Sequence, residues 1–580
     1  MNLIKKMGLL GLGITAPCVL AAPSADDLRA SGAAAGQLQQ ELQRQLPSLQ
    51  NLPQPGPQVQ KPIVREAPDN SVTVTVQGFK VEGNTVISTE EIQAVLAPWL
   101  GKTVTLSELE NATNQVATLY QAKGRLVQVT LPPQKITDGI VTIKIIEAKL
   151  GAVKVESKEP VRFSDERVIS HVTSQQALGE IVSTGAVERA IYILNETPGV
   201  AVTTELEPGQ DDGDVDIRVK LADTPWYRGK VEANNYGNRA TGIRQYNANL
   251  IFDNPGRFGD QLVFSVIKSE GSEYKQASYS LPLNLDGWRL GASTSSLNYE
   301  NVGVFAYPAF AGAGYGTAKT HSVNTSYALL RSTTTNANLT FSNDFKSYEN
   351  KLKQTEDYSS VYTVRDHVFG ASANHYDSFF GGGVTNVSLN RTIGQLNIDA
   401  TKSQNYGVWT PNNYAKWNLT VSRNQKVIPD DVVLNVTFSA QRSNVNLDSS
   451  QKFYLGGPYG VRGYPGSQGG GSEGSMMTLE LQKQLPMKVV GSVFYDHGRI
   501  TQYKTQEAYE ALKGNTHADN TYVLRSVGAG VKYTDAGLTV SLMGGRKLGQ
   551  NPLWDNNGKI INNDGRASRA YLWALANWAF

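Results

Sequence analysis

Apolar and polar residues alternate over most of the chain after residue 225. Trp417, Leu419 and Val421 alternate with Asn, Thr and Ser, and the same period of two recurs over residues 432–440. A period of two places alternate side chains on opposite faces of a β-strand, and segments of about ten such residues are typical of transmembrane strands. Beyond the N-terminal segment no run of eighteen apolar residues occurs, which excludes helical membrane spans. The pattern therefore predicts either a closed transmembrane barrel or a soluble β-sandwich or propeller.

The C-terminal residues distinguish between these folds. Every second residue forms one apolar face and the sequence stops at an aromatic residue: Leu572, Ala574, Ala576, Trp578 and Phe580. A soluble protein gains nothing from such an ending, whereas outer-membrane barrels characteristically end in this way. We therefore expect a transmembrane antiparallel β-barrel over residues 223–580. At about twenty residues per strand and connection, this length would accommodate sixteen strands, which is the number we expect.

The N-terminus is typical of a secretory signal peptide over residues 1–21. Lys5 and Lys6 precede an apolar stretch over 7–19, and the small residues that follow predict cleavage after Ala21. The alternative is a lipoprotein anchored at Cys18, although the proline before it fits that processing badly. Cys18 is the only cysteine of the sequence, so the mature chain is expected to contain none. That expectation excludes disulfides, thiolate metal sites and cysteine nucleophiles.

Residues 24–46 are expected to form a helix. Leucines recur at spacing four (Leu38, Leu42 and Leu46), and two aspartates suit the positive start of the helix. At 1.5 Å per residue the helix would be about 30 Å long, close to the thickness of a bilayer core. Its other faces are rich in glutamine, so it is too polar for lipid but suited to a water-filled barrel. We assign residues 22–46 to a plug helix, with a loosely docked surface helix as the alternative, and residues 47–70 to a proline-rich linker.

Two units with the element order β-α-α-β-β occupy residues 71–150 and 151–222. The first is expected to contain helices at 89–98 and 106–122 and strands at 72–81, 126–130 and 140–147. The second is expected to contain helices at 164–172 and 184–196 and strands at 152–156, 200–206 and 214–220. Both units resemble POTRA domains, the periplasmic modules that precede outer-membrane transport barrels. The segments 79–84 and 194–200 match the turns of that family closely.

Two short motifs within the barrel indicate a more specific family. Val461-Arg462-Gly463-Tyr464 lies on a glycine-rich connection, and Phe494-x-Asp496-x-Gly498 lies on a strand about thirty residues later. They resemble the loop motif and the facing strand motif of the two-partner secretion and outer-membrane assembly superfamily. The resemblance implies that the loop folds back into the barrel lumen and that Arg462 pairs there with Asp496.

The residue pattern of the strand supports this pairing. Along residues 489–496, Phe494 and Asp496 share one face, opposite a face of Val and Tyr residues. A carboxylate that faced lipid would be costly, so Asp496 should face the lumen, where it needs a cation. Arg462 lies on a glycine-flanked loop and can approach with its planar guanidinium. The alternative is an external glycine-rich hairpin with an exposed arginine.

The order of the segments resembles the outer-membrane transporters of two-partner secretion, the TpsB family, over nearly the whole mature chain. The resemblance implies α+β periplasmic domains followed by a transmembrane antiparallel β-barrel with an N-terminal plug helix, located in the outer membrane. The implied partners are the N-terminal secretion domain of a secreted exoprotein (a haemolysin, adhesin or contact-dependent toxin), outer-membrane lipid, and the barrel assembly machinery, which reads the last strand with Trp578 and Phe580. The alternatives are an insertase for other barrels and a passive porin or receptor.

Other classes of function find little support in the sequence. Basic and acidic residues are nearly balanced, 54 against 52, which argues against a nucleic-acid partner. There is no phosphate-binding Gly-Lys-Ser/Thr sequence, and the six histidines lack metal-ligand spacing. Asp496 and His497 are neighbours on a strand and point to opposite faces, so they cannot form a catalytic dyad. We therefore expect no enzyme activity, no catalytic residue, and no metal, cofactor or nucleotide.

Overall fold

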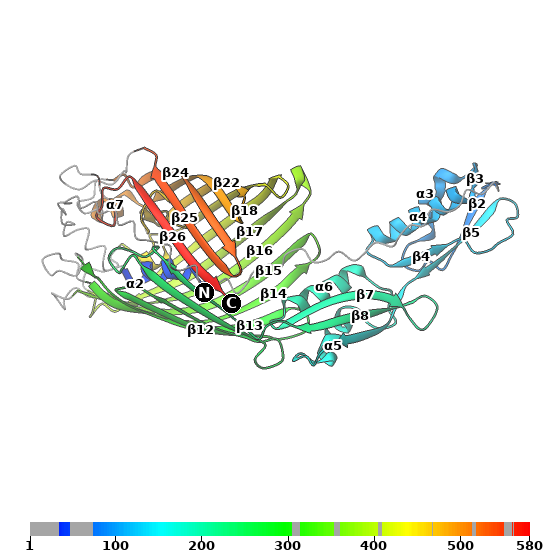
Figure 1. Cartoon of the computed structure of the whole chain (residues 1–580), viewed down its shortest axis with the longest axis horizontal. Coiled ribbons are helices and arrows are strands. Elements are labelled where there is room, and N and C mark those ends of the chain that lie inside the picture. Colours follow the sequence, from blue (N-terminus) through cyan, green and yellow to red (C-terminus); the bar gives the residue numbers. More distant parts are fainter. Residues whose placement is uncertain are drawn as a thin grey trace, which may run out of the picture.

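The computed structural model describes residues 34–46, 73–303, 314–352, 360–403, 409–466, 468–512, 518–549, 560 and 562–580. The expected signal peptide, the expected linker and residues 22–33 of the expected plug helix lie outside the described residues. The described chain forms two small α/β units followed by one large barrel, and the second unit lies between the first unit and one end of the barrel (Figure 1).

The first unit is a small sheet covered by two helices. Its central strand β5 (Ile140–Glu147) pairs in parallel with β2 (Gly78–Glu82) and antiparallel with β4 (Val127–Thr130). A separate pair is formed by β1 (Thr73–Thr75) and β3 (Thr103–Thr105). The apolar faces of α3 (Thr89–Leu96), η2 (Ala97–Trp99) and α4 (Leu106–Ala122) close the core.

The expected single strand over residues 72–81 is wrong, because the backbone changes partners within it. The N–H of Val76 donates to the carbonyl of Lys102 at 3.0 Å, whereas the N–H of Gln77 donates to the carbonyl of Gly139 at 2.8 Å. The segment is therefore split into β1 and β2. Helix α4 begins as expected because Thr105 and Glu108 form a capping box, in which each side chain accepts from the other residue's backbone N–H.

The second unit repeats this order without the extra pair of strands. Its strands run β6-β8-β7, with β6 and β8 parallel and β7 antiparallel to β8: β6 (Lys149–Ser157), β7 (Val200–Pro208) and β8 (Asp214–Asp223). The helices α5 (Asp165–Gln175) and α6 (Thr184–Glu196) contribute apolar residues to a core of its own.

Sixteen antiparallel strands close the barrel, which confirms the predicted strand number. The last strand pairs with the first, and each other strand pairs with its neighbours in the chain. The strands are β9 (Tyr227–Asn234), β10 (Gln245–Asp253), β11 (Gln261–Lys268), β12 (Ser272–Pro282), β13 (Trp288–Glu300), β14 (Gly314–Arg331), β15 (Thr335–Leu352), β16 (Ser360–Asp377), β17 (Gly383–Ile398), β18 (Asn413–Ile428), β19 (Val432–Ser443), β22 (Glu473–Leu485), β23 (Val489–Thr501), β24 (Thr521–Asp535), β25 (Leu538–Lys547) and β26 (Ala570–Ala579).

The period of two has the expected consequence for burial. Trp417 and Phe438 are large apolar side chains that remain exposed on the outer wall, as lipid-facing residues do. Tyr348, Tyr362 and Tyr414 are buried within the barrel. Short elements lie in its connections: η4 (Phe379–Gly381) at the end near the second unit, and α7 (Gln506–Leu512) at the opposite end.

The lumen holds two further segments. One is helix α2 (Ala34–Gln43), which lies inside the barrel (Figure 1). The other is the connection between β19 and β22, which carries η5 (Ser449–Gln451) and the small pair β20 (Phe453–Tyr454) and β21 (Gly470–Gly471). Helix α2 ends at Gln43, short of the expected end at residue 46, because the following N–H groups of Gln45 and Leu46 form tighter turns to the carbonyls of Leu42 and Gln43.

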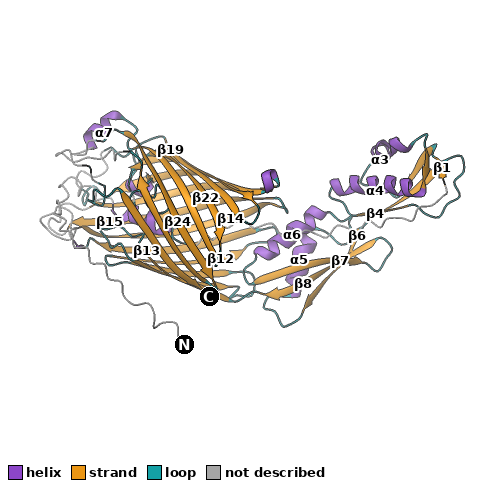
Figure 2. Ribbon diagram, turned by 45° about the horizontal axis from the view of Figure 1, so that its top comes forward, coloured by secondary structure: helices purple, strands orange, loops and turns teal. Residues whose placement is uncertain are grey.

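The second unit is joined to the barrel by ion pairs. Arg331 at the end of β14 is buried, and its Nη2 lies 2.8 Å from Oε2 of Glu196 at the end of α6. Arg189 of α6 reaches Asp286 in the β12–β13 turn, with 2.9 Å between Nη2 and Oδ1. The helices of this unit accordingly lie beside the end of the barrel (Figure 2).

Candidate functional site

The connection between β19 and β22 folds into a compact turn at Val461-Arg462-Gly463-Tyr464. The N–H of Val461 donates to the carbonyl of Leu455 at 2.7 Å, and the N–H of Tyr464 donates to the carbonyl of Val461 at 3.1 Å. Val461 and Tyr464 are fully buried in an apolar cluster with residues of the wall strands β23 and β24. The tip of the connection is therefore packed against the inside of the barrel.

The structure brings Arg462 and Asp496 together. Nη2 of Arg462 lies 2.8 Å from Oδ1 of Asp496, and its Nε lies 3.2 Å from Oδ2. The backbone N–H of Arg462 also donates to Oδ2, at 3.0 Å. Arg462 is 5% exposed and Asp496 is 0% exposed, so this pair is shielded from water. Such a bidentate contact is stronger and more directional than a contact between single charges.

Further wall residues complete the surroundings of Asp496. The hydroxyl of Ser526 donates to its Oδ2 at 2.8 Å, and the hydroxyl of Thr478 donates to its Oδ1 at 3.2 Å. The register explains this convergence, because Thr478 on β22 and Ser526 on β24 both lie directly opposite Asp496 on β23. Both carboxylate oxygens thus have hydrogen-bond donors.

Sequence reasoning missed the second carboxylate that contacts Arg462. Nη1 of Arg462 forms an ion pair with Glu480 on β22, and its guanidinium lies over the ring of Phe494, 3.3 Å from the ring centroid. One cation therefore faces two carboxylates and one aromatic ring. The signal was present in the sequence, since Glu480 alternates with Leu479 and Leu481 and should face the lumen as Asp496 does.

The glycines of both motifs allow the loop to approach the wall closely. A Cβ on Gly463 would lie 2.8 Å from the Cβ of Ser526, and one on Gly498 would lie 2.7 Å from Cδ2 of Leu455. Gly545 on β25 faces the loop as well, because its Cβ would lie 2.6 Å from the backbone of Arg462. A larger residue at any of these three positions would push the loop away from the wall.

The last strand also holds the loop. Trp573 on β26 is buried, and its indole Nε1 donates to the carbonyl of Arg462 at 2.9 Å. The two residues are far apart in sequence, and no local pattern pointed to this contact. Arg462 is consequently tied to three wall strands at once, through Glu480 on β22, Asp496 on β23 and Trp573 on β26.

The two C-terminal aromatic residues lie at the other end of the same strand. Trp578 and Phe580 are each 50% exposed on the outer wall, and their ring centroids lie 5.1 Å apart. The N–H of Phe580 donates to the carbonyl of Gly229 at 3.0 Å, and the N–H of Gly229 donates to the carbonyl of Phe580 at 2.8 Å. The final residue therefore takes part in closing the barrel.

Helix α2 contacts both the wall and the inward connection. Leu38 and Leu42 are buried among aromatic and aliphatic side chains of the lumen, and Nε2 of Gln39 donates to Oγ1 of Thr320 at 2.9 Å. A Cβ on Gly36 would lie only 2.4 Å from the Cβ of Ser450, so the helix packs directly against η5. The leucine spacing thus marks the face that packs in the lumen, and the glutamines supply the polar contacts.

None of the helices in the described residues is long and apolar enough to cross a membrane. Within the same ranges, no group of three or more His, Cys, Asp or Glu side chains could hold a metal ion.

Comparison with known proteins gives the same assignment. Residues 213–531 match the family described as haemolysin secretion/activation protein ShlB/FhaC/HecB, and residues 74–148 match the ShlB-type POTRA domain. The heme/hemopexin transporter protein HuxB of Haemophilus influenzae is 27% identical over 467 residues, which cover 78% of this chain and 80% of that protein. The outer membrane transporter CdiB of Dickeya dadantii is 24% identical over 466 residues, covering 78% and 81% of the two chains.

A solved structure shares the whole fold. CdiB from Escherichia coli superimposes with a TM-score of 0.69 at 21% identity, covering 97% of this chain and 100% of that chain. The barrel is therefore placed in the outer membrane, with the POTRA units in the periplasm. Because the family match covers more than half of the sequence, the chain belongs to the ShlB/FhaC/HecB family, the outer-membrane transporters that translocate a partner protein in two-partner secretion.

Proposed function

We propose that this chain exports one large secreted exoprotein through the lumen of its barrel, and that α2 is a plug that leaves the lumen when the cargo passes. The observation that carries this proposal is the seat of α2, which occupies the lumen and packs against η5 of the inward connection. Burial of Leu38 and Leu42 contributes about 1.5–3 kcal/mol for each side chain. That is enough to hold the helix at rest and small enough for arriving cargo to displace it.

The proposed division of the chain follows the sequence. Residues 1–21 are a signal peptide, 22–46 the plug, 47–70 a linker, 71–150 and 151–222 the two POTRA domains, and 223–580 the barrel. A linker between the plug and the first POTRA domain would let the helix leave the lumen without leaving the protein.

The proposed task of Arg462 is to hold the inward loop against the wall. The contacts of Arg462 with Asp496 and Glu480 are supported by the burial of Arg462 and Asp496 and by the glycines that let the loop approach. Loss of the arginine would strand two carboxylates, one of them fully buried. Val461 and Tyr464 would supply the apolar anchor, while Gly463, Phe494 and Gly498 shape the contact.

Cargo recognition is proposed for the POTRA domains. The edge strands of the sheets are β2 and β4 in the first domain and β6 and β7 in the second, where residues 179–181 pair with the first two residues of β6. An extended chain can add to such an edge through main-chain hydrogen bonds. The N-terminal secretion domain of the exoprotein would therefore be captured while it is still unfolded.

The remaining partners are outer-membrane lipid around the barrel and the assembly machinery that reads the last strand with Trp578 and Phe580. Their outward position on a strand that closes the barrel supports that role. We propose a conduit without enzyme activity, cofactor or nucleotide. Folding of the cargo outside the cell would supply the driving force.

Cross-linking of the plug to the wall tests the proposal. The substitutions Gln39→Cys and Thr320→Cys place thiols on two side chains in hydrogen-bond contact, and the expected mature chain has no other cysteine. A short reducible bis-thiol linker should abolish cargo transport in proteoliposomes, and reductant should restore it. The single-cysteine variants are the matched controls. Undiminished transport by the cross-linked protein would show that the plug need not leave, and deletion of residues 24–46 should independently raise ion conductance in planar bilayers.

A further inference from the structure

The base of the inward connection is fixed to the barrel wall by a polar network of its own. The connection reaches η5 soon after it leaves β19, and the last residue of η5, Gln451, is buried. The backbone carbonyl of Gln451 accepts from Nζ of Lys416 on β18 at 2.9 Å and from Nε2 of Gln441 on β19 at 3.0 Å. Its side-chain Nε2 donates to Oδ2 of Asp366 on β16 at 3.1 Å. These four residues tie η5 to three wall strands, and we call them the η5 latch.

Neighbouring wall residues hold the Asp366 carboxylate in place. Nζ of Lys346 on β15 donates to its Oδ2 at 2.8 Å, and the hydroxyl of Tyr414 on β18 donates to its Oδ1. Asp366 is 1% exposed and Lys416 is 9% exposed, so the latch is shielded from water. The wall therefore defines where Gln451, and with it η5, can lie.

The plug helix α2 rests on the residue next to Gln451. Nε2 of Gln40 donates to the backbone carbonyl of Ser450, which is the middle residue of η5. A Cβ on Gly36 would lie only 2.4 Å from the Cβ of Ser450, closer than two such atoms can approach. The helix thus fits against η5 only while position 36 is glycine and Ser450 stays in place. The position of η5 decides whether the helix has its seat.

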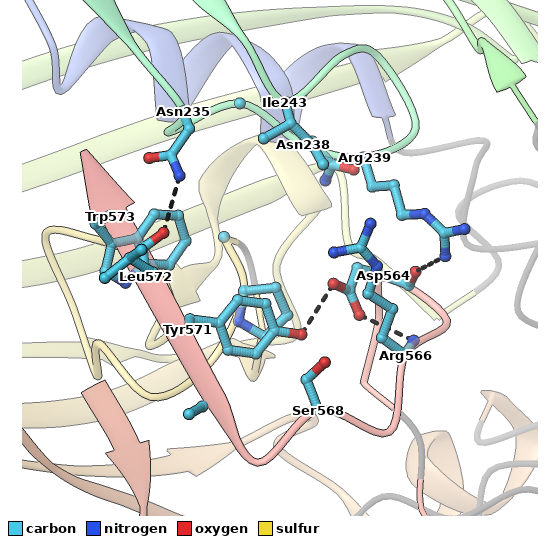
Figure 3. Close-up of a pocket in the computed structure, with 14 residues that line it drawn as sticks. Asn235, Asn238, Arg239, Ile243, Asp564, Arg566, Ser568, Tyr571, Leu572 and Trp573 are labelled. Carbon is cyan, nitrogen blue, oxygen red and sulfur yellow. Dashed lines mark hydrogen bonds between the residues drawn. The ribbon is translucent and has the colours of Figure 1, made fainter. Parts of the chain in front are cut away.

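The tip of the inward connection is held by other strands. Arg462 contacts Glu480 on β22 and Asp496 on β23, and its carbonyl accepts from Nε1 of Trp573, which Figure 3 labels on β26. The latch uses β16, β18 and β19, which form an adjacent but distinct arc of the barrel. The two anchors share no wall strand, so one can open while the other stays closed.

The chemistry of the latch suits a contact that must open. Replacing a buried charge pair by apolar residues is often neutral or stabilising, so charges are not needed simply to hold η5. Separated charges regain hydration in a water-filled lumen, whereas a separated apolar contact would leave apolar surface exposed to water. Asp366 and Lys416 can therefore hold η5 at rest and leave a hydrophilic wall when it departs.

We propose that Lys416, Asp366 and Gln441 are positioning residues for the plug. Through Gln451 they fix η5, and η5 in turn seats α2. The inference rests on the proposed plug function and deepens it, because it names the contact whose release unseats the helix. Opening of the latch frees α2 while Arg462 still holds the tip of the connection.

Three substitutions in the full-length protein disturb the seat from different sides. Lys416→Met removes the ammonium that holds the Gln451 carbonyl, and Gln451→Leu removes the amide that donates to Asp366. Gly36→Ala disturbs the same contact from the plug, although alanine favours a helix more than glycine does. This third variant leaves the wall untouched, so it remains decisive if a wall variant fails to assemble.

The matched control is Asn336→Leu. It also removes a buried hydrogen bond of the lumen wall, from Nδ2 of Asn336 on β15 to Oδ1 of Asn374 on β16 at 3.0 Å. Heat-modifiable migration shows which variants form an assembled barrel. A chain that lacks residues 24–46 gives the conductance of the open lumen.

Labelling of a cysteine on the plug reports how often the helix leaves its seat. All variants carry Gln39→Cys, because Gln39 is buried and the expected mature chain has no other cysteine. A membrane-impermeant maleimide should label the Lys416→Met and Gln451→Leu variants at least about tenfold faster than the parent, since a charged hydrogen bond is worth that much or more. Gly36→Ala should change the rate in the same direction. Ion conductance in planar bilayers should rise toward that of the chain without residues 24–46.

Hydrogen exchange of the amides of residues 457–466 distinguishes the latch from the tip. These amides should exchange at the parental rate in all three variants, and Asn336→Leu should change neither labelling nor conductance. Parental labelling in the latch variants, or equally fast labelling in the control, would overturn the inference if deletion of residues 24–46 still raises conductance. Faster exchange at the tip would show that the two anchors open together, contrary to the inference. Unchanged conductance after the deletion would instead remove the plug function itself, and this inference with it.

Discussion

Replacement of Arg462 by alanine should release the inward loop. The substitution removes the contacts to Asp496 and Glu480 and leaves the fully buried Asp496 with three donors: its backbone partner at position 462, Ser526 and Thr478. Breaking a buried pair by removing one partner costs about 3–5 kcal/mol. We take about 3 kcal/mol, because the remaining donors offset part of the loss. At 1.4 kcal/mol per factor of ten, the loop should leave the wall about a hundredfold more often.

Hydrogen exchange of the amides of residues 457–466 measures this change directly in the folded barrel. The Arg462→Ala variant should exchange about a hundredfold faster there, whereas the POTRA amides keep their rates. Cargo secretion should fall sharply, while heat-modifiable migration still reports an assembled barrel. Arg462→Lys should restore cargo secretion only in part, because the point charge of a lysine cannot reproduce the planar guanidinium that contacts two carboxylates. Arg442→Ala is the control, since that side chain is 87% exposed.

Exchanging the two charges tests whether the ion pair itself matters, or whether the arginine must lie on the loop. Arg462→Asp combined with Asp496→Arg should recover part of the lost secretion, because opposite charges again face each other and Glu480 stays beside the new arginine. The reasoning is refuted if Arg462→Ala secretes normally and its loop amides exchange at the parental rate. If the loop amides exchange faster but secretion is normal, Arg462 does hold the loop against the wall, but this contact has no role in transport.

Three further perturbations test other parts of the molecule. Arg331→Gln removes the buried pair with Glu196, so distances between spin labels on the second POTRA domain and the barrel should broaden; Arg218→Gln, whose partners lie within the domain, should leave them unchanged. Burial opposes ionisation of Glu147, but hydrogen bonds from Thr85, Val86 and Tyr120 lower its pKa below the usual 4.5. Its contribution to stability is therefore present above about pH 4.5 and is lost as the pH falls through the lowered value, and Glu147→Gln should abolish this acid dependence of hydrogen exchange in the first POTRA domain. Asn235 follows β9, and its side chain forms two hydrogen bonds with the main chain of β26, at Leu572 and Ala574. Asn235→Ala removes both and should lower the temperature at which the barrel loses heat-modifiable migration; an unchanged temperature would contradict a contribution of Asn235 to barrel closure.

The sequence by itself determined the architecture, because the signals for it are local. A period of two over ten-residue segments predicts lipid-facing strands wherever they occur, and the length of this region accommodates the sixteen strands that close the barrel. The order of helices and strands identified the two POTRA units. The same alternation placed Asp496 toward the lumen, since a carboxylate facing lipid is costly.

Only the tertiary structure decided which side chains meet. Glu480 and Trp573 contact Arg462 because three wall strands bring them there, and neither belongs to a motif. The split of residues 72–81 into two strands depends on partners at Lys102 and Gly139. The first residues of β26 extend beyond the end of β9, whose last residue Asn234 lies opposite Leu575, and this mismatch is visible only once the barrel closes. Periodicity determines which face a residue takes, but contacts between strands distant in sequence depend on register, which no local pattern encodes.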